Sequence, residues 1–278
     1  MKKFDLAFSM GFSCGGTMAL RKAGLQFVSY PLDWIGSPGI VQSARMIESE
    51  FSGWFEKSDL QLVAVRGGSF NNNVYQNRVT RFGYPHDFTR MRKFDEIYPA
   101  VAAKYERRVA RFLTDVSEAS DVLVVYIERP INARAADDDL RAAKQILECK
   151  FPKSRFELVY FFLDEGRAGY AETVVDDGIT AVACDYVQYD YGEVSHAIRS
   201  DVQYRYLVDR YHIDDKRTQN DKDRYESERR ASKKRKVSVA GNVFQRKVSE
   251  WQYRLYRKLE KILQDKDLVA RDYPLWFD

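Results

Sequence analysis

Four short apolar runs are spaced along the first two thirds of the chain. They lie at residues 6–10, 122–128, 156–164 and 179–185 and are rich in Val, Ile, Phe and Tyr. Near-continuous apolar runs of this length are typical of strands whose two faces are both covered, as in a parallel sheet. We therefore expect these segments to lie side by side in one sheet.

Helical periodicity fills much of the sequence between these runs. Residues 97–116 and 139–151 carry apolar positions at three- and four-residue spacing, and an acidic run at 137–139 stands where the second helix would begin. Strands that alternate with helices predict an α/β fold with right-handed crossovers. We expect three layers, with a mostly parallel open sheet between helices on both faces.

The remaining segments do not follow this alternation of apolar strands and helices. Residues 60–84 contain Gly and Asn clusters followed by alternating polar and apolar positions, which predicts a hairpin or an irregular loop. We assign 1–212 to the α/β domain, 213–241 to a charged linker or solvated helix, and 242–278 to a C-terminal helix and tail. The last helix carries one apolar stripe, typical of packing back onto the domain: Phe244, Val248, Trp251, Leu255, Leu259 and Ile262.

Composition and charge favour a globular protein without a nucleic-acid surface. The chain has 278 residues, of which 45% are hydrophobic, and this is enough for a core. The net charge of the chain is +4, and one segment accounts for it, because residues 214–236 hold ten Lys or Arg and six Asp or Glu. The basic run at 233–236 resembles a nuclear-localisation or nucleic-acid patch, but its acidic neighbours favour a solvated face.

The cysteines and the N-terminus predict a soluble cytoplasmic protein. Cys14, Cys149 and Cys184 form no even disulfide framework, which is typical of a reducing compartment. The basic first residues and a later cysteine look like a lipoprotein signal. However, Asp5 interrupts the apolar region and Gly11 stands where such signals prefer Leu. No stretch reaches the ~20 apolar residues of a membrane span.

Cys14 stands where the first apolar run gives way to a helical pattern. Backbone N–H groups and the helix dipole stabilise a thiolate there, so the pKa of such a cysteine can fall from ~8.5 to between ~3.5 and ~7.5. Gly15 and Gly16 follow, and in a first helical turn we expect them to keep the space beside the sulfur open. The alternative is a buried cysteine that acts as a small hydrophobe.

A thiol nucleophile needs a base, and the chain has three histidines, His86, His196 and His212. His212 ends a helical pattern, where an imidazolium suits the helix dipole, and His196 lies near a helix start. His86 follows Pro85, whose fixed φ predicts that the imidazole is presented from a constrained turn. We expect His86 to be the general base, with a surface loop histidine as the alternative.

Asp33 and Asp87 are the nearest candidates to orient the imidazole of His86. Asp87 is its neighbour in sequence, and adjacent side chains of an extended segment point to opposite faces, so Asp87 reaches it only in a tight turn. Asp33 is distant in sequence from His86 and is not limited in this way. For both aspartates, the alternative is a structural role as a cap or in a turn. The oxyanion donors would be the backbone N–H of Cys14 and a neighbour such as Gly15.

Several side chains are candidates for substrate binding. Arg107 and Arg111 are four residues apart on one predicted helix and could hold a phosphate or carboxylate, or form a salt-bridged surface. Arg129 follows a predicted strand, at the sheet edge where α/β folds bind ligands. The full set is Gly15, Gly16, Trp34, Arg107, Arg111 and Arg129. No metal-ligand spacing and no phosphate-binding loop is present, so we expect no cofactor.

Five strings together resemble a family of uncharacterised bacterial proteins described as papain-like cysteine peptidases. They lie at 9–14, 20–25, 29–34, 84–88 and 104–112, and the match spans roughly residues 4–127. The resemblance implies that Cys14 is the nucleophile and His86 its base. In papain itself an aromatic residue follows the cysteine and the histidine comes ~130–150 residues later, whereas here Gly15 follows and the spacing is 72 residues.

We therefore expect a hydrolase or acyltransferase with a cysteine nucleophile, acting on a small-molecule, glycan or peptide substrate. The resemblance also implies a role in surface-polysaccharide metabolism, because members of the family are associated with such gene sets. The alternative is a non-catalytic binding protein for an anionic or nucleotide-sugar ligand. The sequence does not determine the oligomeric state.

Overall fold

The structure is a computed structural model that describes residues 1–12, 14–66, 72–130, 132–188, 197–198, 201–214, 219–220, 222–224 and 227. The expected C-terminal helix at 243–263, the basic run at 233–236, His196 and the glycine pair at 67–68 lie outside these residues.

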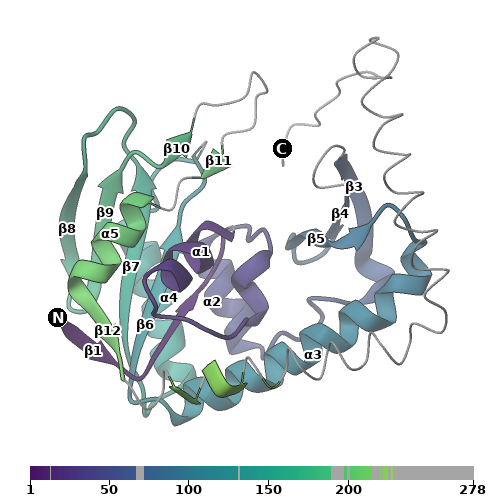
Figure 1. Cartoon of the computed structure of the whole chain (residues 1–278), viewed down its shortest axis with the longest axis horizontal. Coiled ribbons are helices and arrows are strands. Elements are labelled where there is room, and N and C mark those ends of the chain that lie inside the picture. The colour runs from purple at the N-terminus through teal and green to yellow at the C-terminus, as the bar shows by residue number, and fades with distance from the viewer. Residues whose placement is uncertain are drawn as a thin grey trace.

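A five-stranded sheet is the main sheet of the mixed α/β fold, and Figure 1 shows it on the left of the view. Its strands, in spatial order, are β2 (Leu6–Ser9), β6 (Asp121–Ile127), β7 (Arg155–Leu163), β9 (Ile179–Cys184) and β8 (Tyr170–Asp176). The first four are parallel neighbours and β8 is an antiparallel edge strand. The prediction that the four apolar runs pair in parallel is confirmed.

The two faces of this sheet belong to different apolar clusters. The helices of the fold are α1 (Cys14–Lys22), α2 (Ile40–Glu48), α3 (Phe94–Glu118), α4 (Asp137–Lys150) and α5 (Asp201–Arg210). Phe8, Val124 and Leu158 pack in a cluster with residues of α2, α3 and α4. Their neighbours Ala7 and Val125 pack in the other, with residues of α1 and α5. Burial on both faces is the reason why consecutive positions in the middle of these strands are apolar.

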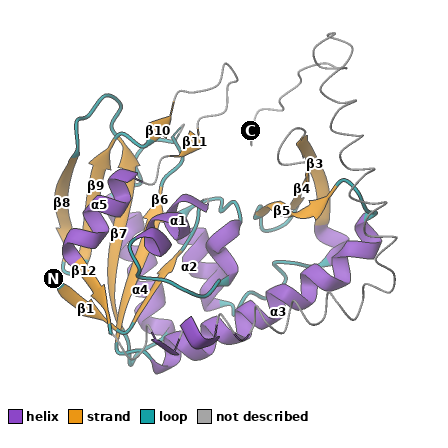
Figure 2. Cartoon of the chain, viewed as in Figure 1, coloured by secondary structure: helices purple, strands orange, loops and turns teal. Residues whose placement is uncertain are grey.

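A second, smaller sheet carries His86. The strands β3 (Leu60–Arg66), β4 (Asn72–Asn77) and β5 (Gly83–Thr89) pair antiparallel in that order. The expected turn around His86 is wrong, because His86 lies inside β5. Pro85 is compatible with this strand because β5 is at the edge of its sheet, where a missing N–H need not break a ladder. Figure 2 shows α3 running from the large sheet to this small one.

A two-stranded parallel sheet joins the N-terminus to the end of α5. It consists of β1 (Lys2–Phe4) and β12 (Tyr211–Ile213), and His212 pairs with Lys3 in its register. The helix ends at Arg210, two residues before His212, and His212 itself lies in a strand and not at the end of the helix as expected. The short strands β10 (Val187–Gln188) and β11 (Ala197–Ile198) pair antiparallel. No helix among the residues described here is both long and apolar enough to cross a bilayer.

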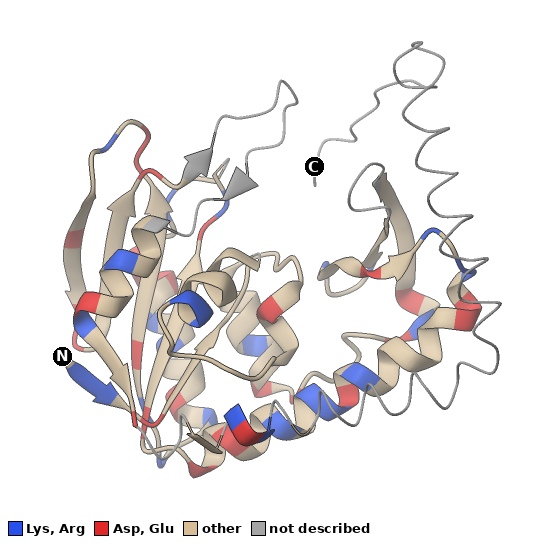
Figure 3. Cartoon of the chain, viewed as in Figure 1, with Lys and Arg blue, Asp and Glu red and all other residues tan. Residues whose placement is uncertain are grey.

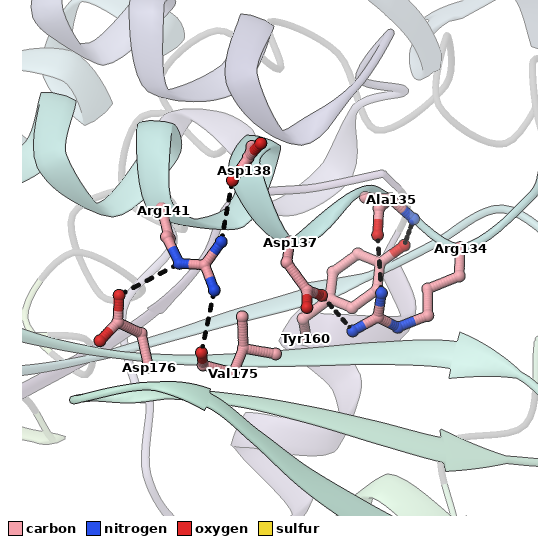
Figure 4. Close-up of polar contacts among 8 residues, drawn as sticks. All are labelled: Arg134, Ala135, Asp137, Asp138, Arg141, Tyr160, Val175 and Asp176. Atoms are coloured by element: carbon pink, nitrogen blue, oxygen red, sulfur yellow. Dashed lines mark hydrogen bonds and ion pairs between the residues drawn. The ribbon is translucent and has the colours of Figure 1, made fainter.

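Ion pairs fix the start of α4 against the sheet, as Figure 4 shows. Arg141 donates to Asp138, to Asp176 and to the carbonyl of Val175, and so links α4 to β8. The hydroxyl of Tyr160 on β7 accepts the backbone N–H of Ala135 at 2.7 Å. Exposed ion pairs contribute about 0–1 kcal/mol each, so they orient the helix and the apolar clusters supply most of the stability.

Helix α1 approaches the sheet closely because Gly16 has no side chain. A Cβ at this position would lie 2.4 Å from Ser9 Oγ and 3.2 Å from Ser9 Cβ, and both residues are buried. The missing side chain of Gly16 therefore lets the first turn of α1 lie against the end of β2. That Gly16 also keeps the space beside the Cys14 sulfur open stays a prediction.

We expect Gly16→Ala to lower the free energy of unfolding by about 1–3 kcal/mol, because the added methyl group overpacks this contact. The opposite sign would follow from helix propensity alone, which favours Ala over Gly by about 1 kcal/mol. Urea unfolding would measure the change. Ser9→Ala in the same chain should recover part of the loss, and a Gly16→Ala protein as stable as the wild type would contradict this account.

Candidate functional site

Cys14 is the first residue of α1 and lies at the carboxyl edge of the large sheet. This is the position expected from the sequence. The chain that leads to it is fixed from two sides, since the Phe12 N–H donates to the Ile127 carbonyl at 3.4 Å and the Ser37 N–H donates to the Phe12 carbonyl at 3.2 Å. The Cys14 side chain is half-buried, Cys149 is exposed and Cys184 is buried.

A short 3₁₀ helix, η1 (Pro31–Trp34), contacts both the helix that begins with Cys14 and the side chain of His86. On one side, the Thr17 hydroxyl in the first turn of α1 donates to the Asp33 carbonyl at 3.1 Å. On the other, the Gly36 and Gly83 backbones exchange two hydrogen bonds of 2.8 Å and so attach the chain after η1 to β5. The element that carries the cysteine and the strand that carries the histidine thus both bind this segment.

Trp34, the last residue of η1, packs against the imidazole of His86. The two rings meet edge to face, with centroids 6.4 Å apart and planes at 87°. The indole is held by its own contacts, because Trp34 Nε1 donates to Ser29 Oγ at 3.2 Å and the Arg21 guanidinium lies 5.3 Å from the ring centroid. Arg21 also donates to Ser29 at 2.7 Å. Trp34 therefore limits the orientations open to His86.

Asp33 is buried in η1 and holds the turn closed. Its Oδ2 accepts the Tyr30 backbone N–H and Gln26 Nε2, each at 2.7 Å. Burial raises the pKa of Asp33, although the two hydrogen bonds and the positive charges of Arg108 and Arg21 act in the opposite direction. Of the roles left open by the sequence, these contacts favour a structural cap.

Asp87 connects β5 to helix α3. Its carboxylate accepts the Tyr105 hydroxyl at 2.5 Å and also binds Lys104 Nζ, and its side chain is almost fully buried. Burial lowers the pKa of Lys104, while the carboxylate of Asp87 raises it. The contacts described for Asp87 are thus with α3, and they fix the strand next to His86.

The arginines of α3 differ in their surroundings. Arg107 is exposed and Arg111 is half-buried, so the expected pair does not share one environment. Arg108, which was not among the selected candidates, lies 5.6 Å from the Tyr105 ring centroid, and its Nη1 is buried with no hydrogen-bond partner among the residues that the structure describes. Its spacing of four residues from Lys104 was the available signal. In Figure 3, several stretches of the α3 ribbon carry the colour of Lys and Arg.

Arg129 lies at the carboxyl end of β6, the edge of the sheet that also holds Cys14, as predicted. Its guanidinium is 4.9 Å from the Phe12 ring centroid, and burial lowers its pKa. Glu128, which the sequence reasoning did not select, accepts the Arg129 N–H at 2.9 Å and the Tyr160 hydroxyl at 3.0 Å. These bonds fix the backbone from which Arg129 extends.

Within the part of the chain that the structure describes, no three His, Cys, Asp or Glu side chains form a group that could hold a metal ion. The polar groups near Cys14 and His86 are hydroxyls, amides, carboxylates and guanidinium groups. Such groups can bind a substrate or move a proton.

Comparison with known proteins gives two matches. A family model described as "Putative papain-like cysteine peptidase (DUF1796)" matches residues 5–161. The "Uncharacterized protein R408" of Acanthamoeba polyphaga mimivirus is 31% identical over 130 residues, which are 40% of this chain and 56% of the viral protein. The aligned part of the chain thus spans just over half of that relative. No solved structure matches the chain significantly.

We expect Cys14 to be the most reactive thiol of the folded protein, because it alone combines a helix start with partial exposure. Cys184 should stay unlabelled near neutral pH, since burial raises its pKa to about 12. Exposed Cys149 is the internal reference for labelling. Iodoacetamide labelling across pH with peptide mapping measures all three, and faster labelling of Cys149 than of Cys14 would remove Cys14 as the nucleophile.

Ionisation of buried Asp33 should lower the free energy of unfolding, so the stability of the protein should depend on pH. Because its pKa is raised above 3.8 in the folded state, the folded protein binds more protons there than the unfolded chain, and the unfolding free energy falls as pH rises from 3.8 through the folded pKa. Asp33→Asn keeps an oxygen for both donors and cannot ionise. We expect its stability relative to the wild type to increase across this pH window in urea unfolding.

Asp33→Ala is the matched control for this experiment. It leaves the Tyr30 N–H and the Gln26 amide without their acceptor, which should cost about 1–3 kcal/mol over the whole pH range. A difference between Asp33→Asn and the wild type that does not change with pH would contradict the raised pKa.

Proposed function

Because this chain belongs to the DUF1796 family, whose model matches its residues 5–161 and whose description names papain-like cysteine peptidases, we propose that it is a hydrolase or acyltransferase with Cys14 as nucleophile and His86 as general base. The observation that carries the proposal is the arrangement around η1. This element binds the first turn of α1, which begins with Cys14, and it packs Trp34 against His86.

The proposed reaction begins with attack of the Cys14 sulfur on an acyl carbonyl carbon. His86 accepts the thiol proton, and the carbonyl oxygen becomes an oxyanion that backbone N–H groups at the start of α1 stabilise. The tetrahedral intermediate collapses with loss of the leaving group, which takes the proton back from His86. Water or an acceptor hydroxyl then attacks the thioester, His86 removes its proton, and the thiol is restored.

The substrate we propose is an acyl ester or thioester of a small molecule or glycan, with hydrolysis and acyl transfer sharing the first half of the reaction. The large parallel sheet, for which we propose a three-layer sandwich, differs from the architecture of papain itself. The family name is therefore a guide to the thiol and imidazole chemistry. Arg129 and Phe12, on the same sheet edge as Cys14, are the proposed contacts for an anionic or sugar part of the substrate.

We expect Cys14→Ala, His86→Ala and the double variant to lose ester and acyl-thioester hydrolysis to a similar residual level, because a thiol and its base act as one unit. Initial rates with p-nitrophenyl acetate and an acyl-coenzyme A thioester would measure this. Each variant must keep the wild-type far-UV circular dichroism spectrum.

The His212→Ala variant is the matched control, since His212 lies on β12 in register with Lys3. It should keep wild-type rates. Near-full activity in His86→Ala, or a change in melting temperature alone, would make His86 structural and favour the non-catalytic binding protein.

A further inference from the structure

Arg224, from the charged segment that follows the α/β domain, binds helix α3. Its Nη1 and Nη2 donate to Asp115 Oδ1 and Oδ2 at 3.1 and 2.9 Å. The Asp115 side chain is 3% exposed and that of Arg224 is 34% exposed. Two parallel hydrogen bonds fix the orientation of both groups, a geometry that Arg offers and Lys does not.

A second contact supports the docking of this segment. Lys222 Nζ lies 5.0 Å from the ring centroid of Phe27, which precedes η1 by a few residues. The segment is thus held at two points, one polar and one cation–π. Both points lie beside the chain that enters η1.

The Asp115 carboxylate also holds the residue from which η1 starts. The Tyr30 hydroxyl donates to Asp115 Oδ2 at 2.7 Å, and the Tyr30 ring packs on Phe112 at a centroid distance of 5.6 Å. Through its backbone N–H, Tyr30 binds the Asp33 carboxylate inside η1. Asp115 therefore connects Arg224 to the element that contacts both α1 and His86.

We propose that Arg224 is a positioning residue for the Cys14–His86 pair, acting through Asp115 and Tyr30 on η1. This inference rests on the proposed function and extends it to a residue outside the matched segment 5–161. Without Arg224, the buried carboxylate of Asp115 loses its bidentate donor and is no longer held in one orientation. Tyr30 then loses its fixed acceptor, and Trp34 no longer holds the imidazole in one place.

Other charged groups also face η1 and its neighbours. They are Arg21 from α1, Asp87 from β5, and Lys104 and Arg108 from α3. A substitution of Arg224 leaves all of them in the chain. Their effect on Cys14 and His86 is therefore common to every variant compared below.

The test is the pH profile of Cys14 alkylation by iodoacetamide in the full chain, with Cys149 as internal reference. Arg224→Ala and Asp115→Asn should move the midpoint upward by about one pH unit, which is about tenfold less Cys14 labelling on the acidic limb. Arg155→Ala is the matched control, because Arg155 pairs with Asp121 at 2.6 Å and is 84% exposed. Its midpoint should equal that of the wild type.

A wild-type midpoint in Arg224→Ala, or an equal shift in Arg155→Ala, would overturn the inference. If Arg224→Ala does not fold, Arg224→Lys tests the inference, because lysine keeps the positive charge but cannot make the two parallel hydrogen bonds of the guanidinium group. An intermediate shift in Arg224→Lys supports the positioning role, and an unchanged midpoint refutes it.

His86→Ala separates this inference from the proposed function on which it rests. If His86→Ala leaves the Cys14 midpoint unchanged, the thiol and imidazole are not coupled and the proposed function fails. If His86→Ala moves the midpoint and Arg224→Ala does not, the proposed function stands and only the positioning role of Arg224 is refuted.

Discussion

The parallel pairing of β2 with β6 is the constraint on which the candidate site depends. Residues Leu6 to Ser9 pair in register with Val122 to Val125, so both strands end at the same edge of the sheet. This pairing places the loop to Cys14 beside the loop that carries Arg129. Each face of these strands packs in a different apolar cluster, so a slip by one residue would move every side chain into the other cluster, where its size and shape do not fit. The register is therefore strongly specified.

The second level of organisation is η1, a single turn with buried polar contacts. The carboxylate of Asp33 inside it and the carboxylate of Asp115 outside it both bind Tyr30. Buried polar groups are costly without partners, so such a turn has few alternative conformations. Through its contacts with Thr17 and His86, this rigidity reaches both proposed reacting groups.

Some of these elements were open to prediction from the sequence because their signals are local. The apolar runs of β6 and β7 follow from burial on both faces, and the start of α4 from its acidic first turn. The junction at Cys14 follows from the change of hydrophobic period. The strand around His86 could not be predicted from such local signals, because β5 is a short edge strand that contains Pro85. Its hydrogen-bond partners come from β4 and from the chain after η1.

The sequence by itself determined the four parallel strands of the large sheet and the place of Cys14 at a helix start, since each depends on near neighbours and on simple burial. It did not predict the antiparallel edge strand β8. Only the tertiary structure decided that Gly16 is a packing contact, that Asp87 binds α3, and that Arg224 reaches Asp115. These contacts join residues far apart in the chain. Their energy depends on distance and desolvation in the folded state, and no local pattern of residues records either.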